Sequence, residues 1–447
     1  MEHFGKKLHI ALLAIFAAIC LAGCLRVTAD DLYSLPQMSE QYLRLSEQIE
    51  SVLNQGAEYS PPTGGSNRQS VQLKDLDGDG RSEVVAFFSF PAESTLKIYI
   101  FTMLEEDYTV AEVIEGSGTS FESIRYEDMN GDGMMELIVG WQMSATLKYF
   151  SIYSIKDFRS ALLAIGEYSE LTVFDINGDG KNDVIALRLP SQEAGAVAQM
   201  LALMEDGEVV SEEARLSGGI EAIARISTGK LADGVPAIFV ESEGKYDEGS
   251  LVTDICAFRD GGFSNISLTS LSGISEETVR ERTIYSSDVD NSGIIKVPKP
   301  RLLRAQSETA YYAIDWYTFR SSGNSYLALT TYHNNSDEWF LILPFDWRGK
   351  VSVKREGIVS GERTVIFSYI GEDDEEYIDF LKIYKSYGDI GAERAKLPGR
   401  TLLMTEGTST YAFELLAPAN SFGLSFDEEL IKGNFRLIYS DWLSGTN

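Results

Sequence analysis

The residues best suited to chemistry in this chain are acids and asparagines that recur in three short loops of one pattern. In each loop an oxygen-bearing side chain stands at positions 1, 3, 5 and 9, glycine stands at position 6, and position 7 offers its backbone carbonyl. Such a loop can wrap one hard cation, because Ca²⁺ takes about six to eight oxygen ligands and glycine permits the sharp turn. The predicted metal ligands are Asp75, Asp77, Asp79, Arg81 (carbonyl) and Glu83; Asp128, Asn130, Asp132, Met134 (carbonyl) and Glu136; and Asp175, Asn177, Asp179, Lys181 (carbonyl) and Asp183.

The charge of these loops favours calcium sites over the alternative, which is three ordinary solvated turns of Asp, Asn and Gly. Carboxylates about 4–5 Å apart repel by roughly 3–4 kcal/mol at an effective dielectric constant near 20, so a cation stabilises a loop that gathers several of them. Flexible all-oxygen coordination favours Ca²⁺ over Mg²⁺. An EF-hand is excluded because position 12 would need a glutamate, whereas Ala86, Val139 and Ala186 stand there. We expect about three bound Ca²⁺ ions.

The three loops begin successive copies of a larger repeat. They start 53 and 47 residues apart, and each is followed by strand-like runs and polar turns that give about four strands per copy. A fourth copy near residues 226–240 keeps a strand but not the acids, and a fifth at residues 288–296 keeps half of them. A period of roughly 40–50 residues with four strands is typical of β-propeller blades. The predicted fold is mainly β, with a propeller of about five four-stranded blades over residues 71–305.

In the spacing of the acids and the strand that follows each loop, these copies resemble the FG-GAP and VCBS repeats of integrin-like β-propellers. The resemblance covers residues 71 to about 300 and implies calcium-binding loops that join strands. It implies little about activity, because such repeats occur in adhesins, lyases and receptors alike. In the fifth copy Lys296 replaces the acid of position 9, so the resemblance carries no metal to Asp288 and Asp290.

The N-terminus predicts export and lipid attachment. Two lysines precede an apolar run at residues 10–22, which is too short to span a bilayer but fits a secretory signal. Residues 21–24, Leu-Ala-Gly-Cys, resemble the lipobox of bacterial lipoproteins, which implies a signal peptide at residues 1–23 and a lipidated Cys24. The alternative is a plain signal peptide with a chance cysteine. Because two acyl chains hold a protein stably on a membrane, we expect an extracytoplasmic protein anchored to the bacterial cell membrane.

The remaining N-terminal residues and Cys256 are predicted to have structural roles. Residues 24–70 are expected to hold the lipidated N-terminus, a helix over residues 39–53 and, over residues 54–70, a linker or loop rich in proline and glycine. Cys256 is the only cysteine left after Cys20 and Cys24. It lies in an alternating pattern typical of a strand, so we predict a buried structural thiol.

Composition excludes several function classes. Lys and Arg total 38 against 68 Asp and Glu, which gives a net charge of −30. So acidic a surface repels phosphate backbones, and no nucleic-acid partner is expected. Two of the three histidines, His3 and His9, precede Cys24. His333 alone offers little to a histidine-based zinc site or to Ser-His catalysis.

Residues 306–447 are predicted to form a C-terminal α+β domain. An apolar face at helical spacing predicts a helix over residues 377–387, and Ser425 with Glu428 makes a capping box for a final helix through residue 438. Aromatic residues gather near the start of this domain, where they either pack in a core or, if exposed, stack on glycan rings. They are Trp316, Tyr317, Tyr332, Trp339 and Trp347.

Two function classes fit these observations. The first is a lipid-anchored, calcium-binding propeller that acts as a binding or scaffold module for a protein or glycan ligand at the cell surface. The second is a surface polysaccharide hydrolase or lyase that uses carboxylates in the blade loops or the C-terminal domain. The chain lacks His, Cys and Ser motifs for nucleophilic catalysis, which favours the first class, and no catalytic residue is assigned.

Overall fold

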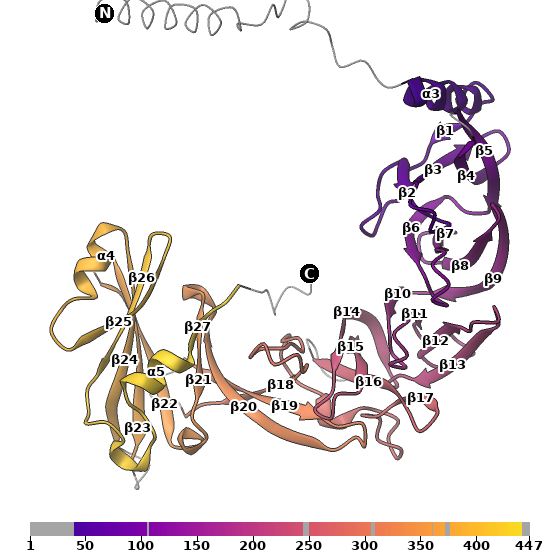
Figure 1. Ribbon diagram of the computed structural model, residues 1–447. Helices are drawn as coiled ribbons and strands as arrows, with labels where there is room; N and C mark the ends of the chain where they lie inside the picture. The colour runs from indigo at the N-terminus through magenta and orange to yellow at the C-terminus, as the bar shows by residue number, and fades with distance from the viewer. Residues whose placement is uncertain are drawn as a thin grey trace, which may run out of the picture.

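The computed structural model describes residues 40–104, 107–244, 250–304, 309–359, 361–371 and 376–439. The predicted signal peptide and Cys24 lie outside these residues. The described chain is mainly β, as predicted, and forms six antiparallel sheets that follow one another along the sequence (Figure 1). No helix within the described ranges is both long and apolar enough to cross a membrane.

The first four sheets are meanders in which each strand pairs with the next, as the predicted four-stranded repeat requires. The second strand of each sheet is almost wholly buried, because it is covered on both faces, and its sequence is accordingly a continuous apolar run. The strands are β2 (Val71–Lys74), β3 (Glu83–Phe90), β4 (Thr95–Leu104) and β5 (Asp107–Gly116); β6 (Ser120–Glu127), β7 (Glu136–Gln142), β8 (Lys148–Lys156) and β9 (Arg159–Tyr168); β10 (Glu170–Phe174), β11 (Asp183–Arg188), β12 (Val197–Leu203) and β13 (Val209–Arg215); and β14 (Ile220–Lys230), β15 (Pro236–Gly244), β16 (Leu251–Arg259) and β17 (Gly262–Asn265).

Each junction between consecutive sheets encloses its own apolar cluster. Phe87 of the first sheet packs with Phe121 of the second, and similar clusters join the second to the third sheet and the third to the fourth. Cys256 belongs to the last of these clusters and is fully buried, and burial raises the pKa of its thiol. The prediction of a structural thiol is therefore confirmed. Each sheet depends on its neighbours for burial, as in other repeat proteins.

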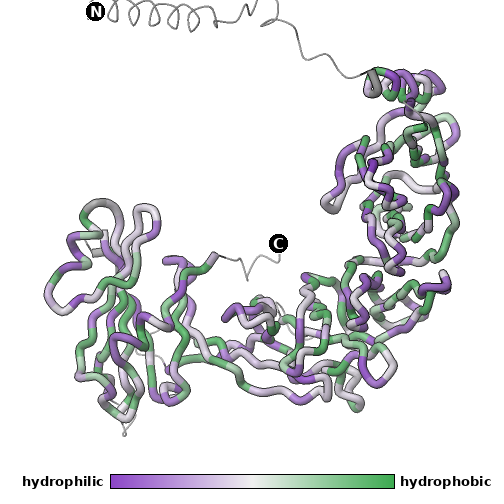
Figure 2. The backbone as a smooth tube through the Cα atoms, viewed as in Figure 1, coloured by the Kyte–Doolittle hydropathy of each residue, from purple (hydrophilic) through white to green (hydrophobic). Residues whose placement is uncertain are grey.

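The sheets are arranged along an open arc in Figure 1. The first strand of each of the first four sheets lies toward the inside of the arc, and the fourth strand lies toward the outside. This strand order matches that of propeller blades. Figure 1 shows no closed ring, since the first and sixth sheets lie at opposite ends of the arc. In Figure 2 hydrophobic residues follow the strands and hydrophilic residues gather at the loops.

The segment predicted as helix and linker is packed onto the first two sheets. Helix α3 (Glu40–Leu53) confirms the predicted helix, and its Leu45, Ile49 and Val52 are buried against the first sheet. Strand β1 (Glu58–Tyr59) adds to the edge of β3. The segment predicted as a linker or loop is tied to the structure here, since backbone hydrogen bonds also join Thr63 and Gly64 to the second sheet.

The fifth and sixth sheets share one large apolar cluster. Strand β18 pairs with β19, so the expected domain boundary at residues 305/306 falls inside the fifth sheet. Among residues 306–447, those that the structure describes are mainly β with two short α-helices, which corrects the α+β prediction. The elements are β18 (Val297–Leu302), β19 (Tyr312–Phe319), β20 (Ser325–Asn334), β21 (Trp339–Leu343) and β27 (Phe435–Leu437); β22 (Val351–Val359), β23 (Glu362–Ile370), β24 (Tyr377–Tyr387), β25 (Arg400–Glu406) and β26 (Ser409–Leu415); α4 (Asp389–Arg394) and α5 (Glu428–Asn434); and the 3₁₀ turns Glu276–Thr278, Asn335–Asp337, Phe345–Trp347 and Ser421–Gly423.

The helix predicted over residues 377–387 is wrong, because these residues form β24. A register shift against β23 leaves Phe380 as an extra residue between the pairs Ser368–Asp379 and Phe367–Leu381. Phe380 and Leu381 are consequently both buried. A β-bulge of this kind interrupts the two-residue period of a strand, so the apolar spacing resembled that of a helix.

The final helix is shorter than predicted and is capped by a different residue. Helix α5 begins at Glu428, and the Asp427 side chain accepts a hydrogen bond from the Leu430 amide at 2.8 Å. Ser425 instead donates its hydroxyl hydrogen to Asp346 at 2.7 Å. The helix ends at Asn434 because residues 435–437 pair with β21 as a strand.

The aromatic residues near the junction belong mostly to the core. Trp316, Tyr332, Trp339 and Trp347 are all buried, and three of them lie in the cluster shared by the fifth and sixth sheets. Tyr317 alone is partly exposed. The described structure therefore supports the core interpretation of this group over an aromatic platform for glycan rings.

Candidate functional site

The three acidic loops occupy equivalent places in the first three sheets. Loop 1 (residues 75–83), loop 2 (residues 128–136) and loop 3 (residues 175–183) each join the first strand of a sheet to the second. The acid of position 9 is in every case the first residue of the second strand, namely Glu83, Glu136 or Asp183. The predicted repeat therefore places three chemically similar loops at the same end of successive sheets.

The three loops share one pattern of hydrogen bonds around the carboxylate of position 1. In loop 1 the two oxygens of Asp75 accept from the amides of Gly78 at 2.9 Å and Gly80 at 3.0 Å. Asp128 and Asp175 accept the equivalent pairs at 2.7 and 3.0 Å and at 2.8 and 3.0 Å. The side chain of position 3 accepts from the amide of position 5, and that of position 5 from the amide of position 7. The backbone therefore holds each acid in place.

The acid of position 9 is the buried member of each loop. Glu83, Glu136 and Asp183 are 3%, 2% and 2% exposed, and each accepts a hydrogen bond from the amide of position 2, at 2.9–3.1 Å. Burial, together with the nearby loop aspartates, raises the pKa of Glu136 and of Asp183 to about 7 and raises that of Glu83. A buried carboxylate beside further carboxylates is stabilised by a positive charge, which a bound cation would supply.

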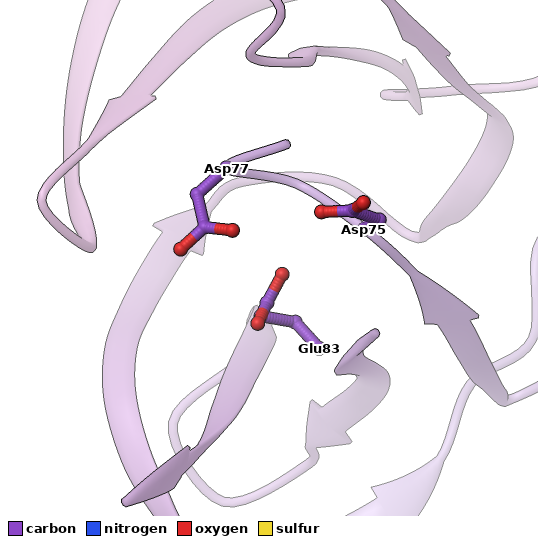
Figure 3. A group of neighbouring side chains, drawn as sticks. All are labelled: Asp75, Asp77 and Glu83. Atoms are coloured by element: carbon purple, nitrogen blue, oxygen red, sulfur yellow. The ribbon is translucent and has the colours of Figure 1, made fainter. Parts of the chain in front are cut away.

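Loop 1 gathers three of its four carboxylates. Asp75, Asp77 and Glu83 each offer an oxygen, and these oxygens lie within 4.8 Å of one another. Figure 3 shows the three carboxylates directed toward a common centre. At an effective dielectric constant of about 20, each pair of charges at this separation repels by roughly 3–4 kcal/mol. Asp79 stands outside the group and accepts from the Arg81 amide at 2.7 Å.

Loops 2 and 3 differ from loop 1 at position 3, where asparagine replaces aspartate. Within the described residues, their acids do not form a group of three at the spacing found in loop 1. The amide nitrogens of Asn130 and Asn177 point at the aspartate of position 5, at 3.1 and 3.2 Å, which leaves the amide oxygens to the backbone. The three loops thus share one backbone arrangement, and in loops 2 and 3 an amide oxygen takes the place of the position-3 carboxylate.

The loops also contact one another, which the sequence did not indicate. The Met135 amide of loop 2 donates to the Leu76 carbonyl of loop 1 at 2.8 Å. A Cβ added to Gly78 would lie 2.5 Å from the Gly133 carbonyl oxygen, and one added to Gly131 would lie 3.0 Å from the Lys181 side chain. The three loops therefore lie side by side across the junctions between sheets. A change in the conformation of one loop would disturb the loop next to it.

A cavity of about 690 Å³ forms a second candidate site, between the first strand of the fifth sheet and the segment that precedes it. Arg280 is neutralised there by Glu241 at 2.8 Å, and both side chains are buried. The Arg282 guanidinium lies 3.5 Å from the centre of the Tyr312 ring, and Lys299 lies 4.9 Å from that of Tyr317. The cavity is lined by Val279, Arg280, Glu281, Arg282, Lys299, Pro300 and Tyr312.

Arg282 and Lys299 differ from Arg280, whose charge is already offset by Glu241. Among the described residues, no carboxylate lies within ion-pair distance of Arg282 or Lys299. Burial lowers the pKa of Lys299, with Glu277 acting in the opposite sense. Stacking on Tyr312 leaves the N–H edge of the Arg282 guanidinium available for a planar anion. The sequence analysis did not find this site, because Arg282 and Lys299 are 17 positions apart and only the fold brings them to one cavity.

Comparisons with known proteins support the repeat. The model of the FG-GAP-like repeat family matches residues 75–139, which hold loops 1 and 2. No curated protein is significantly similar to the chain. Similar solved structures include a protein from Lactobacillus plantarum (9% identity, 72% of this chain and 86% of that chain, TM-score 0.28), the exotype rhamnogalacturonan lyase YesX (10%, 73% and 74%, 0.29) and the Dos1 propeller (8%, 78% and 79%, 0.28). With TM-scores this low, none of the three carries an argument about function.

Gly78→Ala is expected to destabilise the chain more than the matched variant Gly80→Ala. Both glycines have positive φ, +74° and +85°, so alanine costs about 1–2 kcal/mol at either position. At Gly78 the new Cβ would also press on the Gly133 carbonyl, whereas at Gly80 it meets nothing within 4 Å. We expect a further loss of about 1–3 kcal/mol for Gly78→Ala in urea denaturation. Equal losses would contradict the packing of loop 1 against loop 2.

Proposed function

We propose that this protein is a calcium-stabilised β-repeat module, held at the outer side of the bacterial membrane by a lipid on Cys24, that binds a ligand and does not transform it. The observation that carries the calcium part is the shared geometry of the loops. Three position-1 carboxylates make the same two backbone hydrogen bonds, and each loop sets a buried acid opposite them. An all-oxygen donor set on a turn of this kind suits Ca²⁺.

The proposed role of the calcium ion is structural. In loop 1 the ion would be held by Asp75, Asp77 and Glu83, and its charge would offset their mutual repulsion. Extracellular modules bind calcium with Kd on the order of 10⁻⁴–10⁻³ M. A site at ten times its Kd adds about 1.4 kcal/mol to the free energy of unfolding, and three independent sites would add roughly 4 kcal/mol. Because the loops lie across the junctions, this stabilisation would reach several sheets.

Removal of calcium is expected to lower the melting temperature of the soluble protein (residues 25–447). EDTA should destabilise it, and Ca²⁺ should restore the melting temperature better than equal Mg²⁺. Asp77→Ala, Asp132→Ala and Asp179→Ala should each remove one ion from about three found by elemental analysis. Glu193→Ala, which removes an exposed acid outside the loops, is the matched control. A melting curve that EDTA leaves unchanged, with no calcium detected, would refute the proposal.

The cavity beside β18 supports a binding role. Arg282 and Lys299, which form no ion pair with the residues that the structure describes, would attract an anionic group to a protein whose net charge is −30. A glycosidase of the common kind needs two carboxylates at its bond-cleaving centre, and this cavity is lined by one, Glu281. His333 is buried and burial lowers its pKa to about 3, so it is a poor general base. We therefore favour capture of an anionic surface ligand, such as an acidic glycan, over hydrolysis.

Oligogalacturonate, a carboxylated glycan, is expected to bind the soluble protein more tightly than neutral galacto-oligosaccharide of the same length. Arg282→Ala and Lys299→Ala should each weaken binding by about tenfold or more in calorimetry, because each removes a charge-assisted contact. Arg188→Ala, a surface substitution far along the chain in β11, removes the same charge and should have no effect. Equal affinity for both glycans would refute the anionic site, and release of shortened or unsaturated products would favour the hydrolase or lyase alternative.

Cys24→Ala is expected to abolish the membrane anchor. The wild-type protein should incorporate labelled fatty acid and sediment with membranes in a bacterial host, because acyl chains on Cys24 would hold it there. The variant should be unlabelled and either unprocessed or shed. Equal labelling of both proteins would show that Cys24 is not the modified residue.

A further inference from the structure

The loop that precedes the fifth sheet, loop 5 (residues 288–296), has the backbone of the acidic loops but a lysine in place of the final acid. Asp288 stands at position 1 and accepts from the amides of Ser292 at 2.9 Å and Gly293 at 2.6 Å. Gly293, at position 6, has the positive φ found at position 6 of the other loops, +79°. Position 9 is Lys296, where loops 1 to 3 carry Glu83, Glu136 and Asp183.

The Lys296 ammonium lies among the oxygens that the other loops would offer to a metal. Its Nζ is 2.5 Å from Asp290 Oδ1, 2.8 Å from Ser292 Oγ and 3.1 Å from the Ile294 carbonyl oxygen. Asp288 Oδ1 is 3.6 Å away. Asp288, Asp290, Ser292 and Ile294 occupy positions 1, 3, 5 and 7, which are among the predicted ligand positions of loops 1 to 3. An ammonium has three protons to donate, and three of these oxygens lie within hydrogen-bonding distance.

We infer that loop 5 is a cation site whose cation is the ammonium of Lys296. The Lys296 side chain is only 3% exposed, so this is not one of the solvated surface ion pairs that contribute little. The Lys296 side chain instead turns inward. Two carboxylates, a hydroxyl and a carbonyl surround its ammonium and form a preorganised site for that charge. Because the cation is tethered, its local concentration does not depend on the concentration of free ions.

The tethered cation lies at a structural junction. Val297, the residue after Lys296, begins β18, and the Ile295 amide donates to the Lys230 carbonyl of the fourth sheet at 3.1 Å. Loop 5 therefore links the fourth and fifth sheets without a metal. One consequence rests on the proposed function: chelation should loosen loops 1 to 3 while loop 5 keeps its order. The role of Lys296 itself does not require calcium anywhere in the chain.

The first test compares Lys296→Met with the matched control Lys230→Met in EDTA, using the soluble protein. Lys296→Met removes the charge but keeps an unbranched chain, so Asp288 and Asp290 lose their buried partner. We expect its melting temperature to fall by about 5–15 °C, whereas the control, whose side chain is exposed, should melt like the wild type. Equal melting temperatures for the two variants would overturn the inference.

The second test asks whether the site accepts a metal when the lysine is replaced by the acid of the other loops. Lys296→Glu should be unstable in EDTA, should regain stability in millimolar Ca²⁺, and should bind one ion more than the wild type. Failure to gain that ion would overturn the equivalence of loop 5 with a cation site. Because this readout is a difference from the wild type, it stands even if the wild type binds no calcium and the proposed function fails.

A third measurement needs no variant and covers the case in which a substituted chain does not fold. Hydrogen exchange of the wild-type protein, with and without EDTA, should show unchanged protection of peptides spanning residues 288–296. Peptides spanning loops 1 to 3 serve as the internal comparison, and they should lose protection if those loops hold calcium. Loss of protection in loop 5 on addition of EDTA would contradict a tethered cation.

Discussion

Burial of apolar side chains between consecutive sheets is the interaction on which the rest of this structure depends. A four-stranded meander has two faces, and here each junction between sheets has its own apolar cluster. No sheet can bury its faces alone, so the stability of each sheet depends on the folding of its neighbours along the arc. The loops that join first and second strands lie at these junctions, and their conformation therefore bears on the packing of two sheets at once.

Carboxylates at these junctions create a need for positive charge, and the chain meets it in different ways. Loops 1 to 3 present oxygen ligands around a buried acid, an arrangement that suits a bound cation. The fourth sheet lacks such a loop and instead holds Glu241 against Arg280, both fully buried. Loop 5 encloses the ammonium of Lys296. A side-chain cation is permanent, whereas a bound ion can be removed, so stability along the arc would depend on calcium in some places and not in others.

The excess of acids also makes the basic residues of the cavity beside β18 unusual. In a chain with an excess of acids, a cation normally finds a carboxylate partner, as Arg280 does with Glu241. Arg282 and Lys299 face the cavity without such a partner among the described residues, and aromatic rings lie beside both. An exposed arginine and a half-buried lysine next to tyrosines suit an anionic ligand with a flat body. The rest of the acidic surface would repel a polyanion. An anionic ligand would therefore bind at this cavity in preference to other parts of the protein.

The sequence alone determined the repeat, its four strands per copy and the pattern of acids in the loops, because strand alternation, turn glycines and acid spacing are local properties. Helix α3 was likewise predictable from its apolar face. Only the tertiary structure decided which carboxylates converge. The approach of Glu83 to Asp75 and Asp77 depends on how the loop turns back before the second strand begins. The tertiary structure also decided that residues 377–387 form a strand, because the bulge at Phe380 exists only in pairing with β23. The sequence already places Lys296 at position 9 of its own loop, but only the fold decided that its Nζ is buried among the oxygens of that loop. Likewise, only the fold brings Arg282 against Tyr312 and into one cavity with Lys299, because these residues are far apart in the sequence.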